Sequence, residues 1–342
     1  MRILPKTRRG KARLAASLLV LTALFLSPFY FTWMPGSSAN GDLAPLTHAE
    51  LSSRLRLREH VVLFATAISS RDTTHPELLE AAAGVIAGVW HGQGYEVLEQ
   101  EYDAGGVVVR NLEVQIRGAK APDEIVIVGA HYDSAHGWPG ADDNASGVAG
   151  LLELSRFFAP GGSQTPPERT LRFVAFTNEE PPHFQTETMG SVVYAKRCAA
   201  REENVVAMFS LESIGYFRQE LGTQHYPWPL GHFYGERGNF IGFVGDTSAR
   251  SLVHLAIANF RSMTDFPSEG IAAPSVIPGI GWSDHWAFSQ EGFPAIMITD
   301  TAPFRNPHYH KPSDTADTLD YDCMARLVEG LKQMTSEFNQ AQ

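Results

Sequence analysis

The sequence contains few cysteines: Cys198 and Cys323 are the only two in 342 residues, and neither belongs to a Cys-x-x-Cys pair. This scarcity excludes a metal site built from thiolates and allows at most one disulfide bond, which the sequence neither requires nor forbids. Positive charge is also scarce, since 27 lysines and arginines stand against 38 aspartates and glutamates, a net charge of -11. Binding to nucleic-acid phosphates needs a basic face, so we expect no nucleic-acid partner.

A third absence concerns serine chemistry. No serine lies in a Gly-x-Ser-x-Gly elbow, which argues against a Ser–His–Asp hydrolase. The chain also shows no internal repeat and no low-complexity tract. It does contain enough apolar material for a sizeable core, with 44% hydrophobic residues and 11% aromatic ones. With 30 glycines and 21 prolines, the composition is typical of one large or two small loop-rich domains rather than of a helical bundle.

The N-terminus has the pattern of a targeting segment. Basic residues mark the stretch 1–13, and an uncharged apolar stretch follows at 14–34. About 20 apolar residues are enough to cross a bilayer, and basic residues before them predict that the rest of the chain lies outside the cytoplasm. We favour a membrane anchor at 14–34 with a linker at 35–45, because the apolar stretch is long for a signal peptide. Cleavage near the small residues 37–39 would instead give a secreted or periplasmic protein.

Beyond the linker, the apolar residues follow two different periods. Short runs typical of buried strands lie at 125–128, 171–176, 205–211, 240–244 and 295–298, after a hairpin signal at 95–116. Helical spacing is expected at 76–90, 148–158, 189–198, 251–260 and 321–338, and Thr47 to Glu50 forms a capping box before a further helix. Strands that alternate with helices predict an α/β fold around a largely parallel sheet.

Side chains that bind metals follow the expected buried strands. They are His131 and Asp133 after the first, Glu179 and Glu180 after the second, Glu212 after the third, and His308 and His310 after the last. The carboxyl ends of parallel strands meet at one edge of a sheet, where ligands bind. Solvated surface acids would have no reason to recur after each apolar run. Carboxylates and imidazoles gathered at such an edge are typical of a metal site.

Four motifs occur in this order along the chain: His131-Tyr-Asp133, Asp143-Asn-Ala-Ser-Gly147, the pair Glu179-Glu180, and Tyr309-His310 followed by Asp314-Thr315. In these motifs the chain resembles the co-catalytic di-zinc aminopeptidases, whose relatives include membrane glutamate carboxypeptidase and the glutaminyl cyclases. The resemblance covers 46–342 and implies a single zinc peptidase-like catalytic domain. The implied fold is α/β with three α/β/α layers around a central mixed, mostly parallel sheet.

The resemblance also implies two zinc ions per chain. His131 and Glu212 would hold one ion, and Glu180 and His310 would hold the other. Asp143 would bridge the two. Imidazole and carboxylate ligands suit zinc, and a pair of ions polarises a carbonyl while activating a water.

Further roles follow from the same resemblance. Glu179 would be the general base that moves a proton from water to the leaving amine, and Tyr309 would donate a hydrogen bond to the tetrahedral oxyanion. Asp133 and Asp314 would orient the two histidine ligands. Asp284, in a Ser-Asp-His-Trp motif before the last core strand, would orient a ligand or contact the substrate.

Three features depart from this pattern or leave an alternative open. Asp142 competes with Asp143 for the bridging position, and only the spacing of the family motif favours Asp143. Glu212 stands where close relatives often have aspartate. The segment 181–189 is longer than the usual link after the glutamate pair, which predicts a changed pocket rim. The aromatic stretch 226–240 is either a lid over a pocket or a separate apolar cluster, and we favour the lid.

The leading hypothesis is therefore a zinc-dependent metallo-exopeptidase, an aminopeptidase that removes the N-terminal residue of peptides. The free α-amino group of such a substrate needs an acidic partner, which Glu179, Glu212 or Asp284 would supply. An alternative keeps the fold but changes the reaction, as a glutaminyl cyclase-like acyltransferase with a single zinc. A third is a non-catalytic extracellular binding module. The sequence gives no indication of the oligomeric state.

Overall fold

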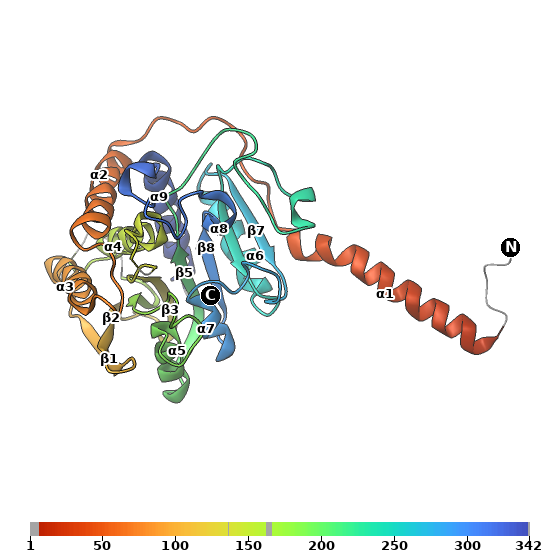
Figure 1. Cartoon of the computed structure of the whole chain (residues 1–342), viewed down its shortest axis with the longest axis horizontal. Helices are drawn as coiled ribbons and strands as arrows, with labels where there is room; N and C mark the ends of the chain where they lie inside the picture. The colour runs from red at the N-terminus through yellow and green to blue at the C-terminus, as the bar shows by residue number, and fades with distance from the viewer. Residues whose placement is uncertain (1–6, 136, 162–165, 341–342) are drawn as a thin grey trace.

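The computed structural model describes residues 7–135, 137–161 and 166–340, and its centre is one eight-stranded sheet (Figure 1). The strands are β1 (Leu98–Asp103), β2 (Val108–Ile116), β3 (Ala121–His131), β4 (Arg169–Phe176), β5 (Asn204–Glu212), β6 (Ile241–Gly245), β7 (Ser268–Ala272) and β8 (Ala295–Thr299). They lie in the order β1-β2-β4-β3-β5-β8-β6-β7. The pairs β3/β4, β3/β5, β5/β8 and β6/β7 are parallel, and the other three are antiparallel. The predicted mixed, mostly parallel sheet is confirmed.

The main helices are α1 (Arg8–Thr32), α2 (His48–Val62), α3 (Pro76–Gly92), α4 (Gly147–Phe157), α5 (Gly190–Ala200), α6 (Arg250–Met263), α7 (His285–Gln290), α8 (Ala302–Arg305) and α9 (Tyr321–Phe338). Alternate residues of β3 enter two different apolar cores, because successive side chains of a strand point to opposite faces. Val126 and Val128 join the core that contains α2, α3, α4, α6 and α9. Ile125 and Ile127 join the core that contains α5 and α7. The three α/β/α layers are therefore confirmed.

The same layering decides the state of the cysteines. Cys198 packs in the core with α5, whereas Cys323 packs in the core with α9, on the other face of the sheet. Both are buried and both are free. No disulfide joins them, because the sheet lies between the two cores.

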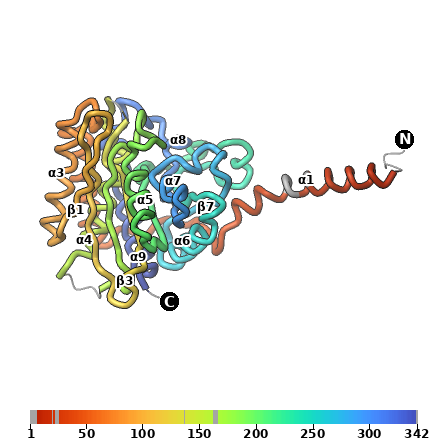
Figure 2. The backbone as a smooth tube through the Cα atoms, turned by 90° about the horizontal axis from the view of Figure 1, so that it is seen from below, coloured from red at the N-terminus to blue at the C-terminus, as the bar shows by residue number. Residues whose placement is uncertain are grey.

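Helix α1 extends away from the sheet and joins it beside β7 (Figures 1 and 2). It holds both the basic residues from Arg8 to Arg13 and the apolar stretch that follows. Among the described residues, no helix combines the length and the apolar character needed to cross a membrane. The span predicted at 14–34 is thus not supported, and part of the predicted basic segment, residues 1–6, lies outside the described residues.

Most elements lie where the sequence pattern places them. α9 covers the predicted range 321–338, and the Thr47 capping box, with both of its hydrogen bonds, begins α2. The pattern analysis missed β7 and α7. Both are short, and β7 has the sequence Ser-Glu-Gly-Ile-Ala, which lacks the run of β-branched residues that marks a buried strand. It forms because β6 provides a parallel partner for every residue of it.

Candidate metal centre

The carboxyl ends of three neighbouring strands place the predicted ligands at one edge of the sheet. β3 ends at His131 and β5 ends at Glu212. His131 pairs in register with Phe176, the last residue of β4, so the turn after β4 brings Glu179 and Glu180 to the same edge. The convergence follows from parallel pairing, because parallel strands end on the same side of a sheet.

The five predicted ligands form two groups that share one carboxylate. In the first group, Nε2 of His131 lies 3.2 Å from Oε2 of Glu212 and 3.3 Å from Oδ1 of Asp143. In the second, Nε2 of His310 lies 3.0 Å from Oδ2 of Asp143 and 3.2 Å from Oε1 of Glu180. Each oxygen of Asp143 therefore faces a different histidine, as a bridging carboxylate requires.

The ligand atoms have the character of a metal site rather than of a hydrogen-bond network. Nε2 of both histidines, Oδ1 of Asp143 and Oε1 of Glu180 are buried and have no hydrogen-bond partner among the described residues. Buried polar atoms without a partner are rare in native proteins and point to an ion or a water. Imidazole nitrogens combined with carboxylate oxygens are ligands that zinc accepts. The residues therefore fit one ion in each group.

Asp133 lies directly behind the ligands and holds three of the groups in place. Its Oδ1 lies 3.3 Å from Nδ1 of His131. It also accepts hydrogen bonds from the backbone N–H of Glu179, at 3.1 Å, and of Glu180, at 3.0 Å. A carboxylate that binds the second nitrogen of a ligand histidine sets the orientation of the ring. The position of Asp133 agrees with the predicted role of orienting His131.

The motif Asp143–Gly147 ties its loop to the end of β5. Asn144 donates a hydrogen bond to the carbonyl of Leu211, at 2.8 Å, and accepts one from the N–H of Ser213, at 3.0 Å. A Cβ on the final glycine of the motif would lie 2.5 Å from the same carbonyl of Leu211, so only glycine allows this approach. Because Leu211 and Ser213 flank Glu212, these contacts set the spacing between the bridge and that ligand.

The choice between the two adjacent aspartates is made by their hydrogen bonds. The carboxylate of Asp142 is occupied elsewhere: it accepts from the N–H of Gly215, at 3.0 Å, and from Nδ2 of Asn306, at 2.7 Å. Asp143 alone stands between the two histidines. Asp143 therefore lies between the two candidate ligand groups, and Asp142 lies behind it.

Asp314 and Asp284 were predicted to orient ligands, but neither hydrogen-bonds to a ligand side chain among the described residues. Asp314 accepts hydrogen bonds from the backbone N–H groups of residues 142 and 143, at 2.9 and 3.2 Å, so it holds the bridging loop rather than His310. Glu212 is held by the hydroxyl of Ser283, which donates to its Oε2 at 2.9 Å. Asp284, the next residue, is fully buried beside this contact and has no hydrogen bond to a ligand among the described residues.

The crowding of buried carboxylates raises their proton affinity. Burial, reinforced by the charge of Asp143, raises the pKa of Glu180 to about 7. Burial also raises the pKa of Glu179 well above its usual range, with Glu212 adding to the effect and His131 opposing it. Divalent cations at this position would offset the mutual repulsion, which is a further reason why the cluster fits metal ions.

The charge state of His310 predicts how zinc binding depends on pH. Burial opposes its protonation, but the carboxylates of Asp143 and Glu180 beside the ring outweigh burial and raise the pKa of His310 to about 10. In the metal-free chain, protonated His310 therefore stabilises the folded state. This stabilisation is complete below about pH 6.5, the pKa of histidine in an unfolded chain, and is lost as the pH rises through about 10. A metal needs the neutral imidazole, so binding releases a proton.

We therefore expect the apparent zinc affinity of the metal-depleted chain to rise about tenfold per pH unit between pH 7 and 9. Competition against a chelator of known affinity at each pH measures it. A His310→Ala variant keeps the other group of ligands. Although burial opposes it, the charges of Glu212 and Glu179 also raise the pKa of His131 well above its usual value, so the remaining site should show a similar dependence. An affinity that does not change with pH in the intact chain would contradict the expectation.

Arg71 is the functional residue that the sequence reasoning missed. It is fully buried, and its guanidinium donates to the carbonyls of Tyr132 (2.8 Å), Phe64 (2.7 Å), Pro139 (2.9 Å) and Gly140 (3.1 Å). Burial lowers the pKa of Arg71 to about 10, although the nearby carboxylates of the centre favour its charge. Arg71 thus fixes the loop between β3 and the bridging motif. Nothing in the sequence marks it, because its partners are backbone atoms.

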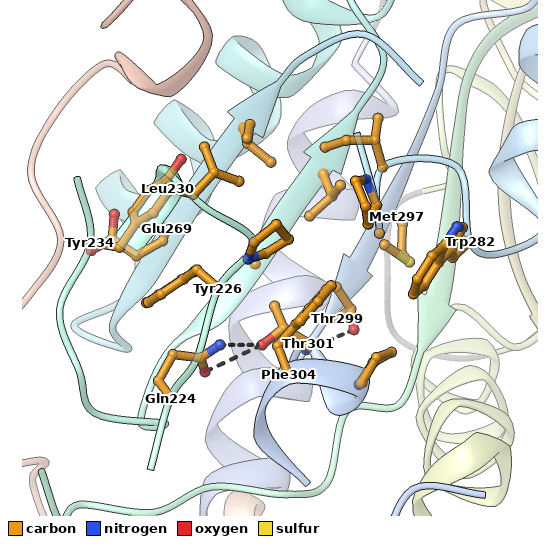
Figure 3. A pocket seen from close by; sticks show the side chains of 18 of the residues that line it. Gln224, Tyr226, Leu230, Tyr234, Glu269, Trp282, Met297, Thr299, Thr301 and Phe304 are labelled. Carbon is orange, nitrogen blue, oxygen red and sulfur yellow. Dashed lines mark hydrogen bonds between the residues drawn. The ribbon is translucent and has the colours of Figure 1, made fainter. Parts of the chain in front are cut away.

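An apolar pocket lies next to the candidate ligand Glu212, and Figure 3 shows side chains that line it. Glu212 and Tyr309 line its inner end, and the ring of Tyr309 stacks on that of His310 with centroids 3.9 Å apart. Its floor comes from β6, β7 and β8, and its roof includes Gln224, Tyr226, Leu230 and Tyr234. We call residues 224–234 the lid. The lid hypothesis for the aromatic stretch agrees with this position, and Trp282 stacks on Phe304 at the opposite wall.

The mixed sheet, the paired candidate ligand groups at its edge and the adjoining pocket indicate a metal-dependent enzyme. A model of peptidase family M28 matches residues 111–335. The chain belongs to this family of metallopeptidases, in which zinc is the expected metal.

Two relatives and two solved structures show the range of similar proteins. The chain is 37% identical to the uncharacterized protein YfbL of Escherichia coli over 91% of this chain and 95% of that protein. It is 27% identical to leucine aminopeptidase 1 of Arthroderma otae, over 60% of this chain and 53% of that protein. In fold it resembles BSAP, a zinc aminopeptidase from Bacillus subtilis (TM-score 0.65, 14% identity, 83% of this chain and 95% of that one). It also resembles the glutaminyl cyclase of Fimbriiglobus ruber (TM-score 0.62, 19% identity, 89% and 98%).

Proposed function

We propose that this chain is a di-zinc aminopeptidase that hydrolyses the N-terminal residue of peptides. The observation that carries the proposal is the position of Asp143, with one oxygen 3.3 Å from His131 and the other 3.0 Å from His310. A carboxylate shared by two ligand groups suits two ions a few Å apart. The 27% identity to a leucine aminopeptidase supports a peptide substrate.

The proposed mechanism gives Glu179 and Tyr309 the roles of proton carrier and hydrogen-bond donor. Bound zinc would polarise the scissile carbonyl and acidify a water. Glu179 belongs to neither ligand group, and its Oε2 lies 3.8 Å from Nε2 of His131. From there its carboxylate takes a proton from the attacking water and returns it to the leaving amine. Tyr309, between the pocket and His310, donates its hydroxyl proton to the oxyanion in a hydrogen bond.

The pocket beside Glu212 supports an apolar first residue. Its walls are largely aliphatic and aromatic, and burying such a side chain there removes apolar surface from water on both sides. The α-amino group of the substrate would then lie at the inner end of the pocket, where Glu179 and Glu212 provide the acidic partner.

The test uses the purified, zinc-loaded chain with leucyl-p-nitroanilide and, in parallel, with a peptide that begins with glutamine. We expect release of p-nitroaniline, loss of activity with a chelator, and two zinc ions per chain by elemental analysis. The likeness to a glutaminyl cyclase supports the alternative reaction. Cyclisation of the glutaminyl peptide without hydrolysis, at one zinc per chain, would replace the aminopeptidase with that acyltransferase.

We also propose that the catalytic domain works outside the cytoplasm, anchored to the membrane or released by cleavage. The support is the order of basic residues, an apolar stretch and the small residues 37–39 in the sequence. Cell fractionation with N-terminal sequencing of the recovered protein tests it. Recovery of an uncleaved chain from the cytosol would contradict it.

A further inference from the structure

The far end of the pocket, away from the metals, is bounded by an edge strand that the N-terminus covers. β7 is the last strand of the sheet, so one of its sides has no neighbouring strand. The end of α1 and the residues that follow it pass along this side (Figures 1 and 2). We call residues 29–38 the strap. Residues 35–38 had the composition of a free linker.

Hydrogen bonds attach the strap to β7 and α6. The hydroxyl of Ser38 accepts from the backbone N–H of Ser268, at 3.0 Å. Arg261 donates one hydrogen bond to the carbonyl of Pro35, at 2.9 Å, and another to the carbonyl of Ser268, at 2.6 Å. One guanidinium therefore connects the strap with the start of β7.

Gly270 is the point where the strap meets the pocket. It lines the pocket, and a Cβ built on it would lie 2.9 Å from the sulfur of Met34. Met34 is buried in the core that contains α6, on the face of β7 opposite the pocket, so it supports Gly270 from behind. From the lid, the hydroxyl of Tyr234 donates to the carbonyl of Gly270, at 2.7 Å. The same strand residue thus contacts the strap on one side and the lid on the other.

Aromatic contacts connect the end of α1 with the lid and the pocket floor. Phe29 packs edge-to-face on Phe233 of the lid, with ring centroids 5.1 Å apart. Phe31 packs against the apolar cluster that contains Ile271 and Met297, which both line the pocket. The strap therefore contacts the lid, the floor and the outer wall of the same pocket.

Strand register shows how far these contacts lie from the reacting atoms. Glu212, Thr299, Gly242 and Glu269 pair in sequence across β5, β8, β6 and β7, so they form one row on one face of the sheet. Three strand spacings separate the ends of the row, about 14 Å. The strap thus lies at the end of the pocket away from the metal ligands, and it acts on a bound side chain indirectly, through the strand β7 and the lid that it contacts.

We propose that the strap is a positioning element of the substrate pocket, which holds the outer wall and the lid so that a large first residue is bound. This inference rests on the aminopeptidase function proposed above. A large side chain fills the space between the lid and the floor, whereas that of alanine leaves most of it empty and depends less on the walls that the strap holds. Because the candidate cleavage site at 37–39 lies at the end of the strap, processing there would remove nearly all of it and change the preference for large residues.

The test compares two substrates in the full-length, zinc-loaded chain. The double variant Met34→Ala/Ser38→Ala weakens the strap, and Asn40→Ala, an exposed change two residues beyond it, is the control. We expect the KM for phenylalanyl-p-nitroanilide to rise about three- to tenfold in the double variant. Its kcat should stay within about twofold, as should kcat/KM for alanyl-p-nitroanilide and the zinc content.

The outcomes distinguish a failure of the proposed strap function from a failure of the proposed aminopeptidase function. A wild-type chain that hydrolyses neither substrate refutes the aminopeptidase function itself. If the wild type is active but the double variant has the same ratio of kcat/KM for phenylalanyl- and alanyl-p-nitroanilide as the Asn40→Ala control, the role of the strap is refuted. An equal loss of kcat/KM on both substrates refutes it as well. If the double variant does not fold, Ser38→Ala alone supplies the same ratio, because it removes one hydrogen bond and leaves the packing of Met34 intact.

Discussion

Replacing Glu179 by glutamine is expected to lower kcat about 10²- to 10⁴-fold, the usual contribution of a general base. Glutamine has nearly the same shape but cannot take up the proton of the attacking water. The two backbone hydrogen bonds from Glu179 and Glu180 to Asp133 remain in place, so the turn should keep its conformation. Zinc content should remain as in the wild type, because Glu179 lies in neither ligand group. Steady-state kinetics with leucyl-p-nitroanilide and elemental analysis of the same sample measure both quantities.

The matched control is Glu187→Gln. Its side chain is 83% exposed and pairs only with Lys196 at the surface, among the described residues. It therefore makes the same chemical change away from the centre, and kcat should stay within about twofold, since surface substitutions have small effects. If Glu179→Gln lowered activity no more than this control, another residue would have to serve as the base. A parallel loss of zinc would show a structural role instead.

Replacing Asp143 by alanine is expected to lower activity as strongly as Glu179→Gln, but through the loss of metal binding. Both ligand groups lose their shared oxygen donor, so we expect at most one zinc per chain. Activity should fall by more than about 10³-fold, because two-metal stabilisation of the transition state is worth several kcal/mol. Elemental analysis after zinc loading and dialysis measures the stoichiometry.

The adjacent Asp142→Asn variant separates the bridge from its support. Asp142 accepts hydrogen bonds from Gly215 and Asn306 and contacts no ligand histidine. We expect this variant to retain two zinc ions and to unfold at a lower temperature, since a buried hydrogen-bond network is disturbed. The reverse pattern, with zinc lost in Asp142→Asn and kept in Asp143→Ala, would exchange the two assignments.

Much of the site could be predicted because its ligands follow short local patterns. His131 and Glu212 end apolar strands, and a strand end can be read from the residues that precede it. Parallel pairing then brings such ends together, whatever the loops between them do. The bridging assignment was less direct, because Asp142 and Asp143 have the same chemistry and lie next to each other. Only the contacts of Asp142 with Gly215 and Asn306 separate them.

The supporting contacts could not be predicted in the same way. Asp314 was expected beside His310, and it instead holds the backbone at 142–143, which lies about 170 residues away in the sequence. Ser283, which holds Glu212, lies 71 residues away from it in the sequence. Such partners depend on how separate loops fold over one another. A sequence pattern that describes one segment at a time contains no information on that arrangement.

The sequence by itself determined the fold class and predicted the five candidate ligands and the candidate base, because each depends on a repeating pattern or on a motif within one segment. The tertiary structure decided which aspartate lies between the two histidines, that Arg71 holds the loop behind it, and that residues 29–38 pack against β7 and the lid. Those outcomes depend on backbone carbonyls and on an edge strand that become available only after distant segments have packed together. The physical reason for this difference is that local periodicity determines the helices and strands, whereas long-range contacts determine which of them pack together.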